Sequence, residues 1–180
     1  MAKTLRQKNV LVSVIIGSDS DLPVIEGGTD VLDRFGIAYE VVLSSAHRSP
    51  ERTYSLAAKA AERGIQVIIA CAGAAAHLAG VIASRTTLPV IGVPVNSPPL
   101  NGLDSLLSTV QMPGGVPVAS MAIGKAGAKN AALMAVRILA LGNSRLVKKL
   151  QAYAVEMGKD IEEKQEKIDL VLKNKSQTKH

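Results

Sequence analysis

The stretch VLVSVIIG at residues 10–17 decides the fold class of this chain. It is an apolar, mostly β-branched run that ends at a glycine and has no alternating polar face. A strand of this kind is buried on both faces, which is typical of the interior of a parallel sheet. Such a sheet needs helices on both of its faces, so the stretch predicts an α/β protein.

The rest of the chain repeats this pattern, because apolar strands alternate with helical segments that end at glycines or begin at prolines. The alternation predicts one parallel sheet with helices on both faces, in a single domain of residues 1–180. The predicted strands are 10–16, 39–43, 67–71, 89–93 and 118–123, and the predicted helices are 22–35, 50–63, 77–85, 102–111 and 125–141.

Two regions depart from this simple alternation. Gly27 and Gly28 interrupt the first helix, and each costs up to about 1 kcal/mol relative to alanine. Either the helix is locally irregular there or another backbone approaches it closely. After the core, residues 10–144, a long charged amphipathic helix is predicted at 145–172, and residues 173–180 are predicted to be disordered.

The net charge of +6 is concentrated at the two ends of the chain. Residues 1–9 carry three basic and no acidic groups, and residues 145–180 carry nine basic and six acidic groups. Residues 10–144 carry nine of each, and only 2% of the chain is aromatic. Without a basic surface or stacking rings on the core, nucleic-acid binding is not expected.

The sequence predicts a cytoplasmic protein that does not enter a membrane. The N-terminal residues lack the apolar segment of a secretory signal, and no apolar run is long enough to span a bilayer. The single cysteine, Cys71, excludes an intramolecular disulfide and a cysteine-cluster metal site. Because it lies in an apolar run, we expect a buried small hydrophobe and not a nucleophile.

Polar residues collect directly after four of the predicted strands. In an open parallel sheet, ligands bind beyond the carboxyl ends of the strands, so these loops together predict a binding site. The loops are GSDSD at 17–21, SSAHRSP at 44–50, AGAAAH at 72–77 and PVNSPP at 94–99.

The first of these loops has the groups that hold a phosphorylated sugar. Ser18 and the amides of the following helix suit a phosphate, and the Asp21 carboxylate suits ribose hydroxyls. The alternative is that Asp19 or Ser20 only caps the helix.

The second and third loops each contain a histidine at a strand end. His47 can take and give a proton near neutral pH, and the neighbouring Arg48 can bind a phosphate through two parallel hydrogen bonds. His77 is a candidate substrate-binding residue, but a helix cap or a donor that orients another side chain fits its position equally well. Neither histidine has the partners of a metal site.

Five motifs together resemble the class I N5-carboxyaminoimidazole ribonucleotide mutases of the AIR carboxylase family. The match runs in order from about residue 12 to residue 141. The motifs are GSDSD at 17–21, SAHRSP at 45–50, AGAAAHL at 72–78, GVPV at 92–95 and QMPGG at 111–115.

The resemblance implies a three-layer αβα, flavodoxin-like fold with a C-terminal helical extension, assembled as a homo-octamer with sites near subunit contacts. It implies conversion of N5-carboxyaminoimidazole ribonucleotide into its 4-carboxy isomer in purine (IMP) biosynthesis, with no metal or organic cofactor. It assigns proton transfer to His47 and substrate binding to Ser18, Asp21, Ser45, Arg48, Ala72, Gly73 and Leu78.

Two departures and one relationship within the family qualify this resemblance. Ala79 stands where proline often precedes Gly80, and the tail beyond Leu141 is longer and more charged than expected. A second class of the family carboxylates aminoimidazole ribonucleotide directly and lacks the alanine-rich loop before His77, so the loop favours the mutase. The mutase reaction is expected to proceed by transient release and recapture of carbon dioxide.

Two other functions remain open on the residues alone. A phosphosugar isomerase would also need a phosphate loop and a histidine, but it usually needs a second acid–base group, and these loops contain no glutamate. A flavodoxin-like nucleotide-binding module would not need His47.

Overall fold

A computed structural model describes residues 9–177, which contain a five-stranded parallel sheet in the order β2-β1-β3-β4-β5. The strands are β1 (Val12–Ile16), β2 (Tyr39–Leu43), β3 (Val67–Gly73), β4 (Val90–Val95) and β5 (Ala119–Ser120). The helices are η1 (Asp19–Asp21), α1 (Leu22–Phe35), α2 (Pro50–Ala58), α3 (Leu78–Ala83), α4 (Leu103–Val110), α5 (Lys125–Ala140) and α6 (Ser144–Gln177).

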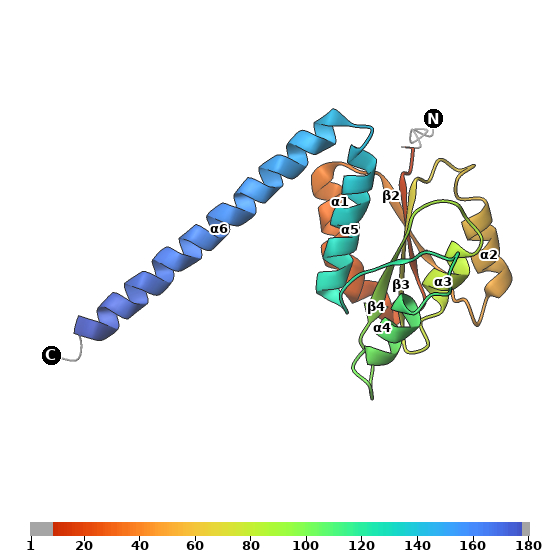
Figure 1. The fold of residues 1–180 in the computed structure, drawn as a ribbon, viewed down its shortest axis with the longest axis horizontal. Helices are drawn as coiled ribbons and strands as arrows, with labels where there is room; N and C mark the ends of the chain where they lie inside the picture. Colours follow the sequence, from red (N-terminus) through yellow and green to blue (C-terminus); the bar gives the residue numbers. More distant parts are fainter. Residues whose placement is uncertain (1–8, 178–180) are drawn as a thin grey trace, which may run out of the picture. The chain divides into compact units, whose positions relative to one another are not determined.

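The sheet is covered on both faces. Figure 1 shows α1 and α5 on one face and α2, α3 and α4 on the other. This is the three-layer αβα arrangement, and the strand order is that of flavodoxin-like folds. The predicted fold class is therefore confirmed.

The central strands are buried on both faces, as the apolar run at residues 10–17 predicted. In β1, Ile15 packs in a cluster with residues of α2 and α3, whereas the neighbouring Val14 lies with Ile25 and Leu32 of α1. β1 pairs in register with β3, where Ile15 lies opposite Ala70. Successive side chains of one strand thus contribute to two separate apolar layers.

Gly28 resolves the question of the two glycines in α1. A Cβ at Gly28 would lie 2.8 Å from the carbonyl oxygen of Ala128 in α5, whereas a Cβ at Gly27 would meet nothing within 4 Å. The helix is continuous through both residues. Close approach of another backbone is therefore the correct alternative, and it applies to Gly28 alone.

Several predicted boundaries differ from the structure. α2 ends at Ala58 instead of residue 63, because the chain tightens into turns in which Arg63 N–H bonds to the Ala60 carbonyl at 3.1 Å. β5 has two residues instead of six. Pro94 of β4 lacks an N–H to continue the ladder, although its carbonyl accepts from Gly124 N–H at 2.8 Å.

The chain divides into two compact units, residues 1–139 and residues 140–180. The second consists mainly of α6, which continues to Gln177. The disorder expected for residues 173–180 stays a prediction, and residues 178–180 lie outside the described part. The description as a single domain stays a prediction. Within residues 9–177, no helix is both long and apolar enough to cross a membrane.

Candidate functional site

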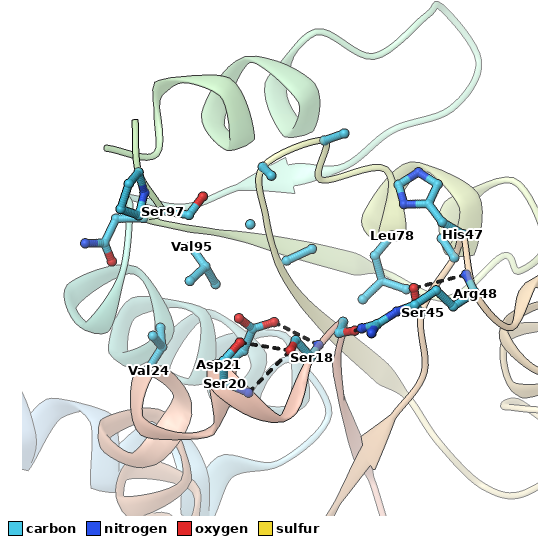
Figure 2. A pocket seen from close by; sticks show the side chains of 18 residues that line it. Ser18, Ser20, Asp21, Val24, Ser45, His47, Arg48, Leu78, Val95 and Ser97 are labelled. Atoms are coloured by element: carbon cyan, nitrogen blue, oxygen red, sulfur yellow. Dashed lines mark hydrogen bonds between the residues drawn. The ribbon is translucent and has the colours of Figure 1, made fainter. Parts of the chain in front are cut away.

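A cavity of about 690 Å³ lies at the carboxyl ends of β1 to β4 (Figure 2). It surrounds the switch point between β1 and β3, where the connections turn to opposite faces of the sheet and ligands bind in such folds. Its volume is within the usual range for small-molecule sites. The lining residues are Gly17, Ser18, Ser20, Asp21, Val24, Ser45, Ala46, His47, Arg48, Ala72, Gly73, Ala74, Ala75, Leu78, Val95, Asn96, Ser97 and Pro98.

Ser18 and Asp21 form a reciprocal capping box at the start of η1. The Ser18 backbone N–H donates to Asp21 Oδ2 at 3.1 Å, and Ser18 Oγ accepts from Ser20 N–H at 3.4 Å. The helix cap expected at Asp19 or Ser20 is therefore Ser18. The box fixes the direction of the first loop while leaving Ser18 and Asp21 on the cavity wall.

The Asp21 carboxylate is almost completely buried, with 6% of the residue exposed. Burial raises its pKa above the ordinary 3.8, while the backbone N–H groups of Ser18 and Gly17 oppose this by stabilising the charged form. An acceptor of this kind is suited to the hydroxyl groups of a ligand.

Arg48 and Ser45 face the same part of the cavity as the first loop. Arg48 Nη2 donates to the Gly17 carbonyl at 3.2 Å, and Arg48 N–H donates to Ser45 Oγ at 3.2 Å. Ser49 closes this loop, since its Oγ accepts from Ser45 N–H at 3.1 Å. The guanidinium has five N–H donors, so most of them stay free of this contact and can bind an anion.

The two histidines predicted at strand ends contact each other. His47 Nε2 lies 2.8 Å from His77 Nδ1, and the rings meet edge to face with centroids 4.9 Å apart. His77 begins α3 without a side-chain cap bond, and it is not among the residues that line the cavity. Of its open roles, the contact supports the one in which His77 orients another side chain, His47.

The third loop forms a wall of small side chains. Ala72, Gly73 and Leu78 line the cavity, together with Ala74 and Ala75. Ala74 has a φ of 51°, a left-handed conformation that is uncommon for a residue with a Cβ. The strand end therefore turns sharply here and brings backbone and methyl groups to the cavity surface.

Sequence reasoning placed the fourth loop at this edge but assigned no role to its residues. Val95, Asn96, Ser97 and Pro98 line the cavity, and Figure 2 shows Val95 and Ser97 on the side away from His47. Their position after an apolar strand was the available signal, and no residue type among them stood out.

Nucleophilic and metal chemistry have no support among the described residues. Cys71 is fully buried, and burial together with the charge of Asp21 raises the pKa of its thiol, as expected for an inert cysteine. Across residues 9–177, no three His, Cys, Asp or Glu side chains are grouped as they would be to bind a metal ion.

Comparison with known proteins adds to this geometry, because the family model described as AIR carboxylase matches residues 11–160. The chain belongs to the AIR carboxylase family. It is 54% identical over 169 residues to the N5-carboxyaminoimidazole ribonucleotide mutase of Pyrococcus horikoshii, covering 94% of each chain.

Two further family members widen the comparison. The chain is 52% identical over 145 residues to the chloroplastic phosphoribosylaminoimidazole carboxylase of Vigna aconitifolia, covering 81% of this chain and 26% of that protein. It superposes on the crystal structure of Treponema denticola PurE with a TM-score of 0.76 and 30% identity, covering 85% of this chain and 94% of that one. The family predicted from the loop motifs is therefore confirmed.

Proposed function

We propose that this protein is an isomerase that converts N5-carboxyaminoimidazole ribonucleotide into 4-carboxyaminoimidazole ribonucleotide in purine biosynthesis. The observation that carries the proposal is one cavity that combines the exposed His47 with Arg48, Ser18 and Asp21. The relatives named mutases, such as that of Pyrococcus horikoshii, agree with it.

In this proposal the phosphate and ribose bind at the β1 and β2 ends of the sheet. Ser18, Ser45 and Arg48 hold the phosphate, because they combine hydroxyl donors with a guanidinium whose fork matches phosphate oxygens. The Asp21 carboxylate accepts hydrogen bonds from ribose hydroxyls. The imidazole then lies against the small wall of Ala72 to Ala75.

The reaction moves one carboxyl group and returns one proton. The bond between the exocyclic nitrogen and the carboxyl carbon breaks, carbon dioxide is released into the pocket, and His47 protonates the nitrogen. Ring carbon C4 attacks the retained carbon dioxide, and His47 then removes the C4 proton, which restores both the aromatic ring and its own protonation state. Holding the two fragments together replaces a bimolecular encounter, which is worth up to about 7–11 kcal/mol.

His77 is a positioning residue in this mechanism. Its hydrogen bond to His47 Nε2 restricts the ring and determines which of the two nitrogens carries the shared proton. Neither step requires a metal or organic cofactor.

The experiment follows labelled carbon during the reaction of the purified protein with N5-carboxyaminoimidazole ribonucleotide. In buffer that contains labelled bicarbonate, the mutase forms the 4-carboxy product with little label. Conversion by the wild-type protein that disappears in His47→Asn separates this enzyme from a phosphosugar isomerase and from a binding module.

Direct carboxylation of aminoimidazole ribonucleotide is the second candidate, since the Vigna aconitifolia relative is named a carboxylase. It predicts complete entry of label and faster turnover of aminoimidazole ribonucleotide with carbon dioxide. Full equilibration of label within a single turnover would replace the mutase by this carboxylase.

We further propose that the protein works as a cytoplasmic homo-octamer. Apolar side chains are exposed on β2 (Val41, Leu43), on α4 (Leu103, Leu107, Val110) and on α6 (Val155, Ile161, Ile168, Leu172), where subunit contacts would cover them. Light scattering at micromolar concentration tests this, and a monomer would contradict it.

A further inference from the structure

Ser97 is a hydroxyl on the cavity wall without a protein partner. Its Oγ is buried and makes no hydrogen bond to any other described residue. Buried polar atoms in native proteins are almost always paired, so an unpaired one at a ligand site calls for an explanation. Pairing with bound substrate is such an explanation.

The neighbours of Ser97 have their hydrogen bonds satisfied without it. The Val95 carbonyl accepts from Ser105 Oγ at 2.8 Å, and the same hydroxyl lies 2.9 Å from the Gly102 carbonyl. A Cβ built on Gly73 would lie 3.5 Å from Ser97 Oγ, so the glycine places no side chain against the hydroxyl. No competing protein acceptor holds the hydroxyl in place.

Rotation about its Cα–Cβ bond gives the Ser97 hydroxyl access to the cavity. A serine side chain has three staggered positions, and the residue itself lines the cavity. Because Oγ leaves no hydrogen bond behind, turning toward a ligand acceptor costs little. A hydroxyl already bonded within the protein, such as Ser105 Oγ, would lose its bonds in the same movement.

The position of Ser97 selects the part of the substrate that it can reach. Figure 2 shows Ser97 and Val95 on one side of the cavity and His47 on the other, with Ser18 and Asp21 between them along the floor. With the phosphate at Arg48 and the reacting C4 edge of the ring toward His47, the opposite edge of the imidazole faces Ser97. The side of the ring away from the C4–C5 bond consists of N1, C2 and N3, and because N1 carries the ribose, N3 is the one ring atom on that side that can accept a hydrogen bond.

We propose that the Ser97 hydroxyl donates a hydrogen bond to this unsubstituted ring nitrogen and so positions the aminoimidazole for transfer. The inference rests on the proposed function, because it takes its ligand from it. Ser97 is a substrate-positioning residue that discriminates the imidazole from rings without an acceptor at that place. It takes no part in proton transfer, which stays with His47.

The test uses Ser97→Ala with Ser120→Ala as the matched control. Ser120 Oγ is the other buried hydroxyl without a partner in the described chain, and it lies in β5, outside the cavity lining. Calorimetry measures binding of aminoimidazole ribonucleotide and of the 4-carboxy product, and thermal unfolding measures the stability of each variant without ligand. Wild-type turnover and binding are measured first.

Ser97→Ala is expected to weaken binding of both nucleotides by about two- to twelvefold, the range of one neutral hydrogen bond. The Michaelis constant rises by a similar factor and turnover changes less, because the contact exists before and during reaction. Thermal stability without ligand stays equal or rises in both variants, and Ser120→Ala keeps wild-type affinity.

Three results would overturn the inference. Unchanged affinity of Ser97→Ala shows that the hydroxyl does not contact substrate. A lowered unfolding temperature without ligand shows that it is paired inside the protein. Weaker binding of the carboxy product alone assigns the contact to the carboxylate and not to the ring. Failure of the wild-type protein to bind or convert the nucleotides contradicts the proposed function itself, and the inference with it.

Discussion

Replacing the two adjacent glycines of α1 by alanine, one at a time, is expected to change stability in opposite directions. At Gly28 the new Cβ would lie 2.8 Å from the Ala128 carbonyl oxygen and 3.2 Å from its carbon. These are backbone atoms of α5, so no side-chain rotation relieves the clash and the two helices must separate. At Gly27 the new methyl group meets nothing within 4 Å.

The magnitudes follow from two terms. Alanine gains up to about 1 kcal/mol of helix propensity over glycine at either position. Overpacking a tight contact costs about 1–3 kcal/mol, and this applies only at Gly28. Gly27→Ala is therefore expected to be stabilising and Gly28→Ala net destabilising. Their difference isolates the contact, because the propensity term cancels.

Urea unfolding measures both variants at one fixed protein concentration, because the stability of the proposed oligomer depends on concentration. The midpoint of Gly28→Ala should fall below that of the wild type, and that of Gly27→Ala should rise above it. Equal shifts in the two variants would refute the close approach of α1 and α5 at Gly28.

Three further predictions concern the candidate site. His47→Asn should lower turnover by a factor of about 10²–10⁴ while nucleotide binding persists. His77→Phe loses one hydrogen bond of about 0.5–1.5 kcal/mol, so it should lower turnover by only about two- to twelvefold. Steady-state kinetics in which His77→Phe is the slower variant would contradict the assigned roles. Arg48→Ala should raise the Michaelis constant by about tenfold or more with little change in turnover, and the opposite split would remove Arg48 from phosphate binding. Asp21→Asn should be at least as stable as the wild type at neutral pH. Burial raises the folded-state pKa of Asp21 above 3.8, so the wild type loses stability as the pH rises from 3.8 through that folded-state pKa. Urea titrations at several pH values should show a smaller loss in the variant, which has no carboxylate to ionise at this position.

The sheet could be predicted from sequence because its signal is local. Each of β1, β3 and β4 is a short, mostly apolar run without an alternating polar face, which is typical of a strand buried on both faces. The ends of α1 were also predictable, since Gly36 takes the left-handed conformation that terminates the helix.

The incorrect boundaries depend on contacts between distant segments. β5 is short because of Pro94, a residue of another strand some 25 positions earlier in the sequence. α2 ends early because the turns after it bring Ala60 and Ile65 into the core. The helix or strand propensity of one segment contains no information about Pro94 of another strand or about the packing of Ala60 and Ile65 in the core.

The position of the candidate site could be predicted from sequence, but the contacts between its residues could not. The rule for parallel sheets placed His47 and His77 at one edge, yet their spacing of 30 residues gave no sign of the hydrogen bond between them. The sequence placed the loop of Ser97 at this edge but did not distinguish Ser97 within it, because its unpaired hydroxyl is visible only once the surrounding acceptors are known to be satisfied.

Capping and ligand binding were posed as alternatives for the first loop, but the structure shows how one group can serve both. Ser18 Oγ accepts a hydrogen bond from Ser20 N–H and can still donate its own proton. In this structure it donates that proton to Asp19 Oδ1 at 3.1 Å. Ser45 Oγ likewise accepts from Arg48 N–H and keeps its proton. The accepted bond fixes the direction of the hydroxyl and the remaining proton can reach an anion, so a capped loop is already ordered when the ligand arrives. Binding at such a loop loses less conformational entropy than binding at a free one. Ser97 is the exception, because its hydroxyl neither donates nor accepts a hydrogen bond within the protein. Ser97→Ala is therefore expected to weaken ligand binding without lowering the stability of the fold.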